Sequence, residues 1–125
     1  MTDRNESILD SIKNSLGIEE DETAFDDDLT MHINSVFGVL NQLGVGPKTP
    51  YFITNASNAW DEFTNLPKGT IEYVKSYMYL KVKLIFDPPG SSIAVEAMKQ
   101  TANEYEWRLM VAMEQLPKNE GEEDE

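Results

Sequence analysis

The sequence contains no cysteine and only one histidine, His32. Without cysteine, the chain can form neither disulfide bonds nor thiolate metal sites. A single histidine, with no second one elsewhere, is a poor basis for a zinc site or a histidine-based catalytic triad. The sequence therefore predicts no catalytic residue, no metal site and no bound cofactor.

Long apolar runs are also missing. None approaches the roughly 20 residues that a membrane-spanning helix needs, and the polar N-terminus, Met1 to Glu6, does not resemble a secretory leader. We therefore expect a soluble, intracellular protein that does not associate with membranes. Its 125 residues are enough for one domain with a substantial core.

Basic residues are scarce. Lysine and arginine number 10 against 23 aspartates and glutamates, which gives a formal net charge of −13. A protein that grips nucleic acid needs cations to neutralise phosphates and release counterions. We therefore expect DNA to be repelled by this chain.

The acidic residues are concentrated in two tracts. Such runs are usually solvated loops or disordered tails, so we predict a loop for the first tract and a disordered tail over 118–125 for the second. The contiguous acids lack the alternation and central glycine of an EF-hand, and no apolar pocket surrounds them to raise a carboxyl pKa. The first tract contains Glu19, Glu20, Asp21, Glu22, Asp26, Asp27 and Asp28, and the second contains Glu120, Glu122, Glu123, Asp124 and Glu125.

Apolar residues recur at helical spacing in four segments. The first helix is expected over 7–16 and the second from the acids at 26–28 to residue 43, each followed by a glycine, Gly17 or Gly44, that can end it. Asp26 or Asp27 can cap the second helix, because a carboxylate there also complements the helix dipole. Between these helices, Ile18 and Phe25 are expected to anchor the acidic loop to the core.

Two further helices are expected in the C-terminal half. The third begins at Thr70, as a possible cap, and ends before Pro88 and Pro89, which cannot continue a helix. The fourth is capped by Ser91 or Ser92 and closed by Pro117. Its predicted inner stripe consists of Ala94, Ala97, Met98, Thr101, Tyr105, Leu109, Ala112 and Leu116.

The region 44–69 shows no helical period and is punctuated by glycine and proline. Residues 51–54 have strand-like composition, and we expect an extended segment that could pair with its own chain or with a neighbouring one. Trp60 and Phe63 are expected to fix this loop through one or two helical turns. The predicted fold is thus all-α: a small bundle of four main helices with a long irregular central loop, forming one domain over 1–117.

Taken in order, several stretches resemble the head-tail connector family, also called adaptor or head completion proteins, of long-tailed double-stranded DNA phages. No single stretch is a catalytic signature, so the resemblance rests on their order in a short acidic chain. The stretches are Ile8 to Lys13, Leu16 to Ile18, Phe25 to Leu29, His32 to Phe37, Leu40 to Pro47, Lys75 to Pro89 and Glu104 to Arg108.

The resemblance implies a structural subunit without enzymatic activity, made in the host bacterial cytoplasm and located in the virion neck. Such subunits form a closed ring, usually dodecameric, beneath the portal protein. The ring extends the DNA channel toward the tail and a tail-side completion or stopper protein. The C-terminal helix, from Glu104 to Leu116 and beyond, is the part expected to dock on the portal, and double-stranded DNA is expected to pass without specific binding.

Ring closure by head-to-tail contacts uses two different faces of each subunit. Surplus apolar residues on the third and fourth helices are the candidates for subunit and portal interfaces: Tyr73, Tyr77, Tyr79, Phe86, Trp107, Met110 and Val111. The acids of the first tract, Glu19 to Glu22 and Asp26 to Asp28, are candidates for lining or flanking the lumen, where they would keep DNA from adhering. The alternative is an acidic interaction protein, such as a regulator that mimics DNA, and a small enzyme ranks third.

Overall fold

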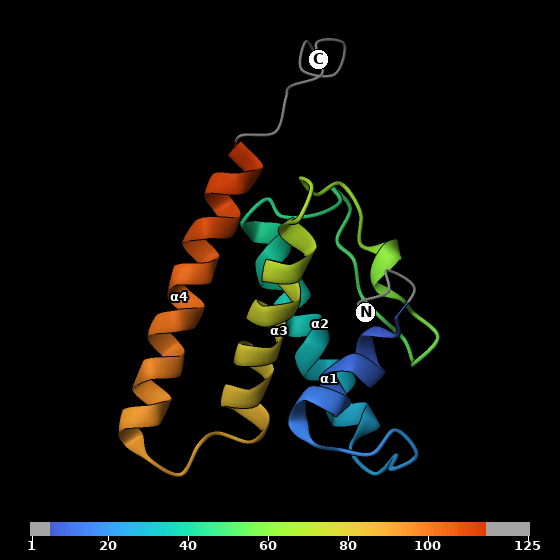
Figure 1. The fold of residues 1–125 in the computed structure, drawn as a ribbon. Coiled ribbons are helices and arrows are strands. Elements are labelled where there is room, and N and C mark those ends of the chain that lie inside the picture. The colour runs from blue at the N-terminus through green and yellow to red at the C-terminus, as the bar shows by residue number, and fades with distance from the viewer. Residues whose placement is uncertain (1–5, 115–125) are drawn as a thin grey trace.

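The computed structural model describes residues 6–114, which form four α-helices and one turn of 3-10 helix (Figure 1). These elements confirm the all-α prediction. The predicted positions of Leu116 and Pro117 and the predicted tail lie outside the described residues. The elements are α1 (Ile8–Leu16), α2 (Asp26–Gln42), η1 (Trp60–Glu62), α3 (Thr70–Phe86) and α4 (Ser92–Glu114).

The helix ends follow the local signals in the sequence at several points. The Ser7 hydroxyl accepts a hydrogen bond from the Asp10 N–H at 3.2 Å and caps α1. Gly17, with φ of 82°, supplies the left-handed residue that ends this helix. The Ser91 hydroxyl accepts from the Ala94 N–H at 3.0 Å, so Ser91 rather than Ser92 caps α4.

Two predicted caps are wrong. Phe25, not an aspartate, occupies the N-cap position of α2 and makes no side-chain cap hydrogen bond, while Asp26 is the first helical residue. At α3 the cap position belongs to Gly69, and Thr70 is already helical and buried. In both cases the residue predicted as the cap lies one position inside the helix, and Asp26 pairs there with Lys13.

The core lies between α1, α2, α3 and the central loop. All three helices contribute fully buried aliphatic residues, and the loop contributes Val45, Ile53, Trp60 and Phe63. The Trp60 indole donates to the Ser11 hydroxyl at 2.9 Å, which fixes the loop on α1. Phe37 of α2 makes aromatic contacts with Trp60 and Phe63, with ring centroids 6.2 and 5.0 Å apart. The prediction that these two aromatics hold the loop is confirmed.

The extended segment at 51–54 finds its partner in a side chain. The Ile53 N–H donates to Asn34 Oδ1 at 2.8 Å, and Asn34 Nδ2 donates to the Ile53 carbonyl at 2.9 Å. The carboxamide of Asn34 therefore does what a neighbouring strand would do. Because both backbone groups of Ile53 are satisfied within the chain, pairing with a neighbouring chain is not needed there.

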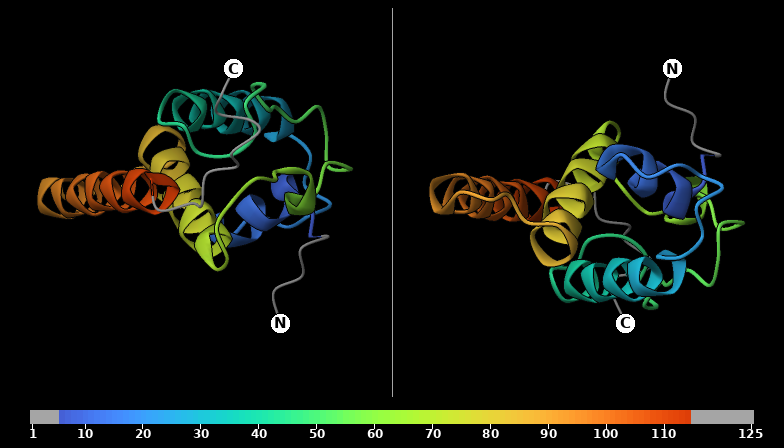
Figure 2. Two further views of the ribbon diagram at one scale, coloured as in Figure 1. Left: turned by 90° about the horizontal axis from the view of Figure 1, so that it is seen from above. Right: turned by 90° about the horizontal axis from the view of Figure 1, so that it is seen from below.

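Helix α4 lies along α3, on the side away from α1 and α2 (Figure 2). Of its 23 residues, Ala102 and Leu109 are fully buried. The predicted inner stripe is correct at Leu109 but wrong at Ala97 and Thr101, which are exposed. The buried stripe instead contains Ala102 together with Leu109, seven residues apart on one side of the helix.

Candidate functional site

Tyr77 belongs to the core and not to an interface. Its side chain is completely buried, and its hydroxyl donates to Glu106 Oε2 of α4 at 2.6 Å. Burial, followed by the bond to the Glu106 carboxylate, raises the pKa of Tyr77 above its ordinary value. The prediction that Tyr77 offers an intersubunit surface is therefore wrong, because the residue joins α3 to α4 within one subunit.

Tyr73 and Tyr79 lie on or near the α3–α4 contact. The Tyr73 ring, which is 45% exposed, meets Tyr105 of α4 edge to face at 5.8 Å. Tyr79 is half-buried and lines a groove between α3 and α4 together with Tyr105, Thr101 and Ser15 of α1. These two tyrosines keep part of their surface available to a partner.

Phe86 forms a small aromatic cluster at the C-terminal end of α3. Phe25 meets it edge to face with ring centroids 5.4 Å apart, and His32 of α2 lies 6.4 Å away. Phe25 remains 41% exposed, so it lies against the end of α3 and is not a core anchor. Ile18, by contrast, packs against the core as predicted.

The outer face of α4 carries three of the predicted residues. Trp107 lies two residues from buried Leu109, hence on the opposite side of the helix, and is 63% exposed. Met110 is 38% exposed and Val111 half-buried. Sequence reasoning missed Ile93, which is 83% exposed and shares the Trp107 face because multiples of seven residues return to one side of a helix.

A second groove between α3 and α4 was also missed. It lies on the other side of the α3–α4 pair from the groove that Tyr79 lines. Its α4 residues Lys99 and Asn103 are on one side of buried Ala102, whereas Thr101 of the first groove is on the other. Its volume is about 400 Å³. We call it the lysine groove, and it is lined by Lys81, Leu84, Ile85, Lys99, Ala102 and Asn103. No signal in the sequence marks this groove, because its two lysines belong to different helices.

The first acidic tract is held in place by one buried lysine. Lys13 of α1, 1% exposed, donates to the Glu20 carbonyl at 2.9 Å, and its ammonium lies 2.8 Å from Asp26 Oδ1. Among the described residues, Asp26 Oδ1 accepts no well-directed hydrogen bond, so this contact is an ion pair. Burial raises the pKa of the nearby Asp10, and the negative charge of Glu20 raises it further.

The other acids of this tract face solvent. Glu19, Glu20, Asp21 and Glu22 are exposed in the loop between α1 and α2, and Asp27 and Asp28 are exposed in the first turn of α2. Within residues 6–114, no three histidine or acidic side chains are placed to hold a metal ion. None of the helices described is long and apolar enough to cross a membrane.

The seven predicted interface residues thus do not form one surface. Tyr77 is internal, Tyr73 and Tyr79 flank the α3–α4 contact, Phe86 lies at the end of α3, and the remaining three lie on outer α4. The arrangement therefore presents separate exposed surfaces on α3 and α4.

The family model described as phage connector protein matches residues 8–116. This range contains all four helices, from the first residue of α1 to the last residue of α4. Comparison with curated proteins and with solved structures gives no match. The chain therefore belongs to the phage connector family and is a structural head-tail connector protein of the virion.

Proposed function

We propose that the protein forms a closed dodecameric ring beneath the portal in the virion neck and extends the DNA channel toward the tail. The observation that carries this proposal is the connector-family match over residues 8–116. The same match favours the connector over the DNA-mimic regulator and the enzyme. A tail-side completion or stopper protein would bind the opposite end of the ring.

The outer face of α4 is the proposed portal-docking surface. Trp107 and Ile93 are the most exposed large apolar residues on this helix, at 63% and 83%. Such side chains, unpaired with their own subunit, are the kind that supply binding energy in a partner's pocket. Met110 and Val111 extend the same region toward the end of the helix.

Ring contacts would use surfaces on two different sides of each subunit. Tyr73, Tyr79 and Phe86 are the proposed contributions of α3, since each keeps some exposed or half-buried surface. The exposed acids of the first tract would border the lumen. There they would repel phosphates, so that DNA passes without adhering.

The test is reconstitution with the portal protein of the same virus. Portal rings incubated with this protein should gain one additional ring when imaged by electron microscopy, with a mass increase by light scattering that gives the subunit number. Portal rings that remain unchanged, together with a protein that stays monomeric or dimeric at all concentrations, would contradict the proposal.

A further inference from the structure

Within residues 6–114, the two lysines of the lysine groove, Lys81 and Lys99, form no ion pair. Of the other basic residues in this range, Lys13, Lys75, Lys83 and Arg108 each form an ion pair, and the exposed loop lysines Lys48 and Lys68 do not. The Lys81 ammonium lies over the Tyr77 ring at 5.9 Å. In a chain of net charge −13, two unpaired lysines flanking one groove mark a site for negative charge.

The apolar floor of the groove indicates what its occupant must carry besides negative charge. Leu84, Ile85 and Ala102 line it between the lysines, and Ile85 is 53% exposed. Burying this apolar surface is favourable only if the incoming segment also carries an apolar side chain. The groove therefore fits an acidic segment with an aromatic or aliphatic residue.

The chain itself contains such a segment. The loop between α1 and α2 exposes Glu19, Asp21 and Glu22, and it ends at the partly exposed ring of Phe25. Lys13 fixes this loop through Glu20 and Asp26, so its shape is set before any partner arrives. A segment held in this way loses little conformational entropy on binding.

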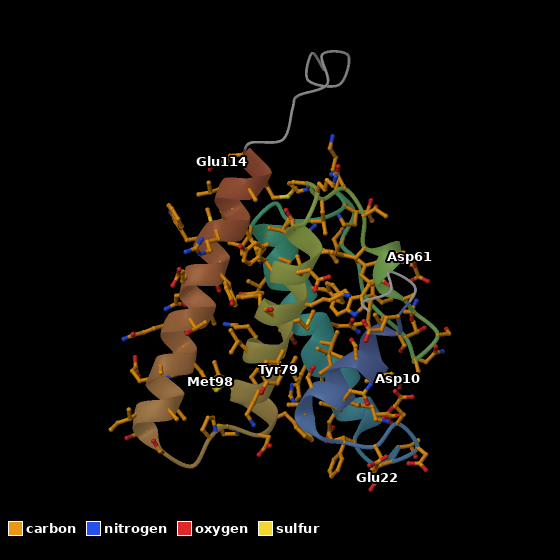
Figure 3. All side chains as sticks on the ribbon, viewed as in Figure 1. Asp10, Glu22, Asp61, Tyr79, Met98 and Glu114 are labelled. Atoms are coloured by element: carbon orange, nitrogen blue, oxygen red, sulfur yellow. The ribbon has the colours of Figure 1, made fainter. Side chains whose placement is uncertain are left out.

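One subunit does not place these two surfaces together. In Figure 3, Glu22 of the loop lies beside α1 and α2 and Met98 lies on α4, with α3 between them. Two complementary patches on different faces produce a head-to-tail contact, which closes into a ring when the rotation per subunit permits.

We propose that the lysine groove of one subunit receives the acidic loop of the next, with Lys81 and Lys99 facing Asp21 and Glu22. This inference rests on the proposed ring and names its contact. Asp21 and Glu22 would then lie in the subunit contact and not at the lumen, which leaves the exposed Asp27 and Asp28 to border it.

Charge reversal tests the contact. The groove variant Lys81→Glu/Lys99→Glu and the loop variant Asp21→Lys/Glu22→Lys should each reduce ring formation at least tenfold, with or without portal. An equimolar mixture should assemble again, because each reversed surface then meets a complementary one, and the fourfold variant should assemble by itself. The matched control, Lys48→Glu/Lys68→Glu, makes the same charge change on exposed loop lysines and should assemble normally.

The outcomes separate this inference from the ring itself. If wild-type protein assembles and the variants do so equally well, the ring stands and the contact is wrong. If the groove variant fails but neither the mixture nor the fourfold variant recovers, the acidic loop is not the occupant; the acids at 120–125 are then the competing segment. If wild-type protein never assembles, both proposals fail.

The absence of native cysteine allows a second test. Glu22→Cys combined with Asn103→Cys should give a ladder of oxidised, disulfide-linked oligomers, because Asn103 lines the lysine groove. Glu22→Cys with Thr101→Cys is the control, since Thr101 lines the opposite groove. Equal amounts of disulfide-linked oligomers from the two cysteine pairs would overturn the assignment of the acidic loop to the lysine groove.

Discussion

Lys13 shows how a single residue organises the acidic loop. Its ammonium is buried and joins α1 to the Glu20 carbonyl and to Asp26 at the start of α2. Removing one partner of a buried ion pair leaves polar groups without compensation, which is more costly than losing an exposed pair. Lys13 therefore couples the stability of the fold to the position of the loop.

Lys13→Met should lower the free energy of unfolding by about 1–3 kcal/mol, because methionine retains the apolar stem but loses the charged contacts. Urea unfolding followed by circular dichroism measures this change. The exposed Lys48→Met is the control and should change stability by less than about 0.5 kcal/mol. A similar effect from both substitutions would show that the buried contacts contribute nothing.

Glu62 allows a test of the central loop by pH. The Asn58 amide and the Tyr51 hydroxyl donate to Glu62 Oε1 at 3.0 and 2.8 Å and hold the pKa of Glu62 below its ordinary value. A carboxyl group with a lowered folded-state pKa contributes stability above its unfolded pKa of about 4.3, and this stability is lost as pH falls through the folded value.

Tyr51→Phe should therefore raise the pKa of Glu62 toward its ordinary value, while the remaining Asn58 bond retains part of the shift. Carbon-detected NMR titration of the Glu62 carboxyl group measures it directly. Phe52→Leu, at an exposed neighbouring position, should leave the titration unchanged. An unaltered midpoint in Tyr51→Phe would mean that the phenol does not stabilise the carboxylate.

At the residue scale, the sequence could predict roles where chemistry leaves few choices. The αL glycine at Gly17, the cap at Ser91 and the aromatic pins Trp60 and Phe63 were foreseen from residue type and position. Tyr77 could not be assigned in this way. Helix α3 contains Tyr73, Tyr77 and Tyr79, and only the packing of α4, with Glu106 as acceptor, decides which tyrosine is internal.

Helix α4 has an exposed face and a buried face, and one pair of substitutions distinguishes their roles. Trp107→Ala should weaken association with the portal or the ring at least tenfold while changing stability by no more than about 0.5 kcal/mol, because Trp107 is largely exposed. Leu109→Ala, on the buried face, should cost about 2–5 kcal/mol of stability. Portal co-sedimentation and urea unfolding are the two measurements.

If Trp107→Ala destabilised the monomer as much as Leu109→Ala, the tryptophan would be a packing residue and the docking surface would have to lie elsewhere. Loss of binding without loss of stability is the expected pattern. Val95→Ala, at a half-buried position near the other end of α4, controls for general effects of shortening a side chain.

The positions of the helices along the sequence could largely be predicted, whereas the side of each helix that faces the core could not. Four helices with their glycine and proline stops follow from helical spacing and breakers. The rotation of α4 was misjudged because alanine and threonine at 97 and 101 are too small to mark a buried face. The lysine groove could not be found either, since Lys81 and Lys99 belong to different helices and only the packing of α3 on α4 brings them together.

For the whole molecule, charge leads to a prediction about DNA. The protein should show no binding to duplex DNA, and lowering the salt concentration should not induce it, because screening decreases while both partners are negative. Fluorescence anisotropy of a labelled duplex measures this. Binding that strengthens at low salt would instead reveal an exposed basic surface large enough to overcome the net charge of −13.

The turn between α3 and α4 sets the angle between these two helices. Helix α4 has 23 residues and packs along α3, and this contact includes the hydrogen bond between Tyr77 and Glu106. A helix of that length is roughly 34 Å long, so a tilt of about 10° at the turn moves its far end by about 6 Å. In the proposed ring, a slight change of this angle in every subunit would therefore widen or narrow the circle formed by the far ends of α4.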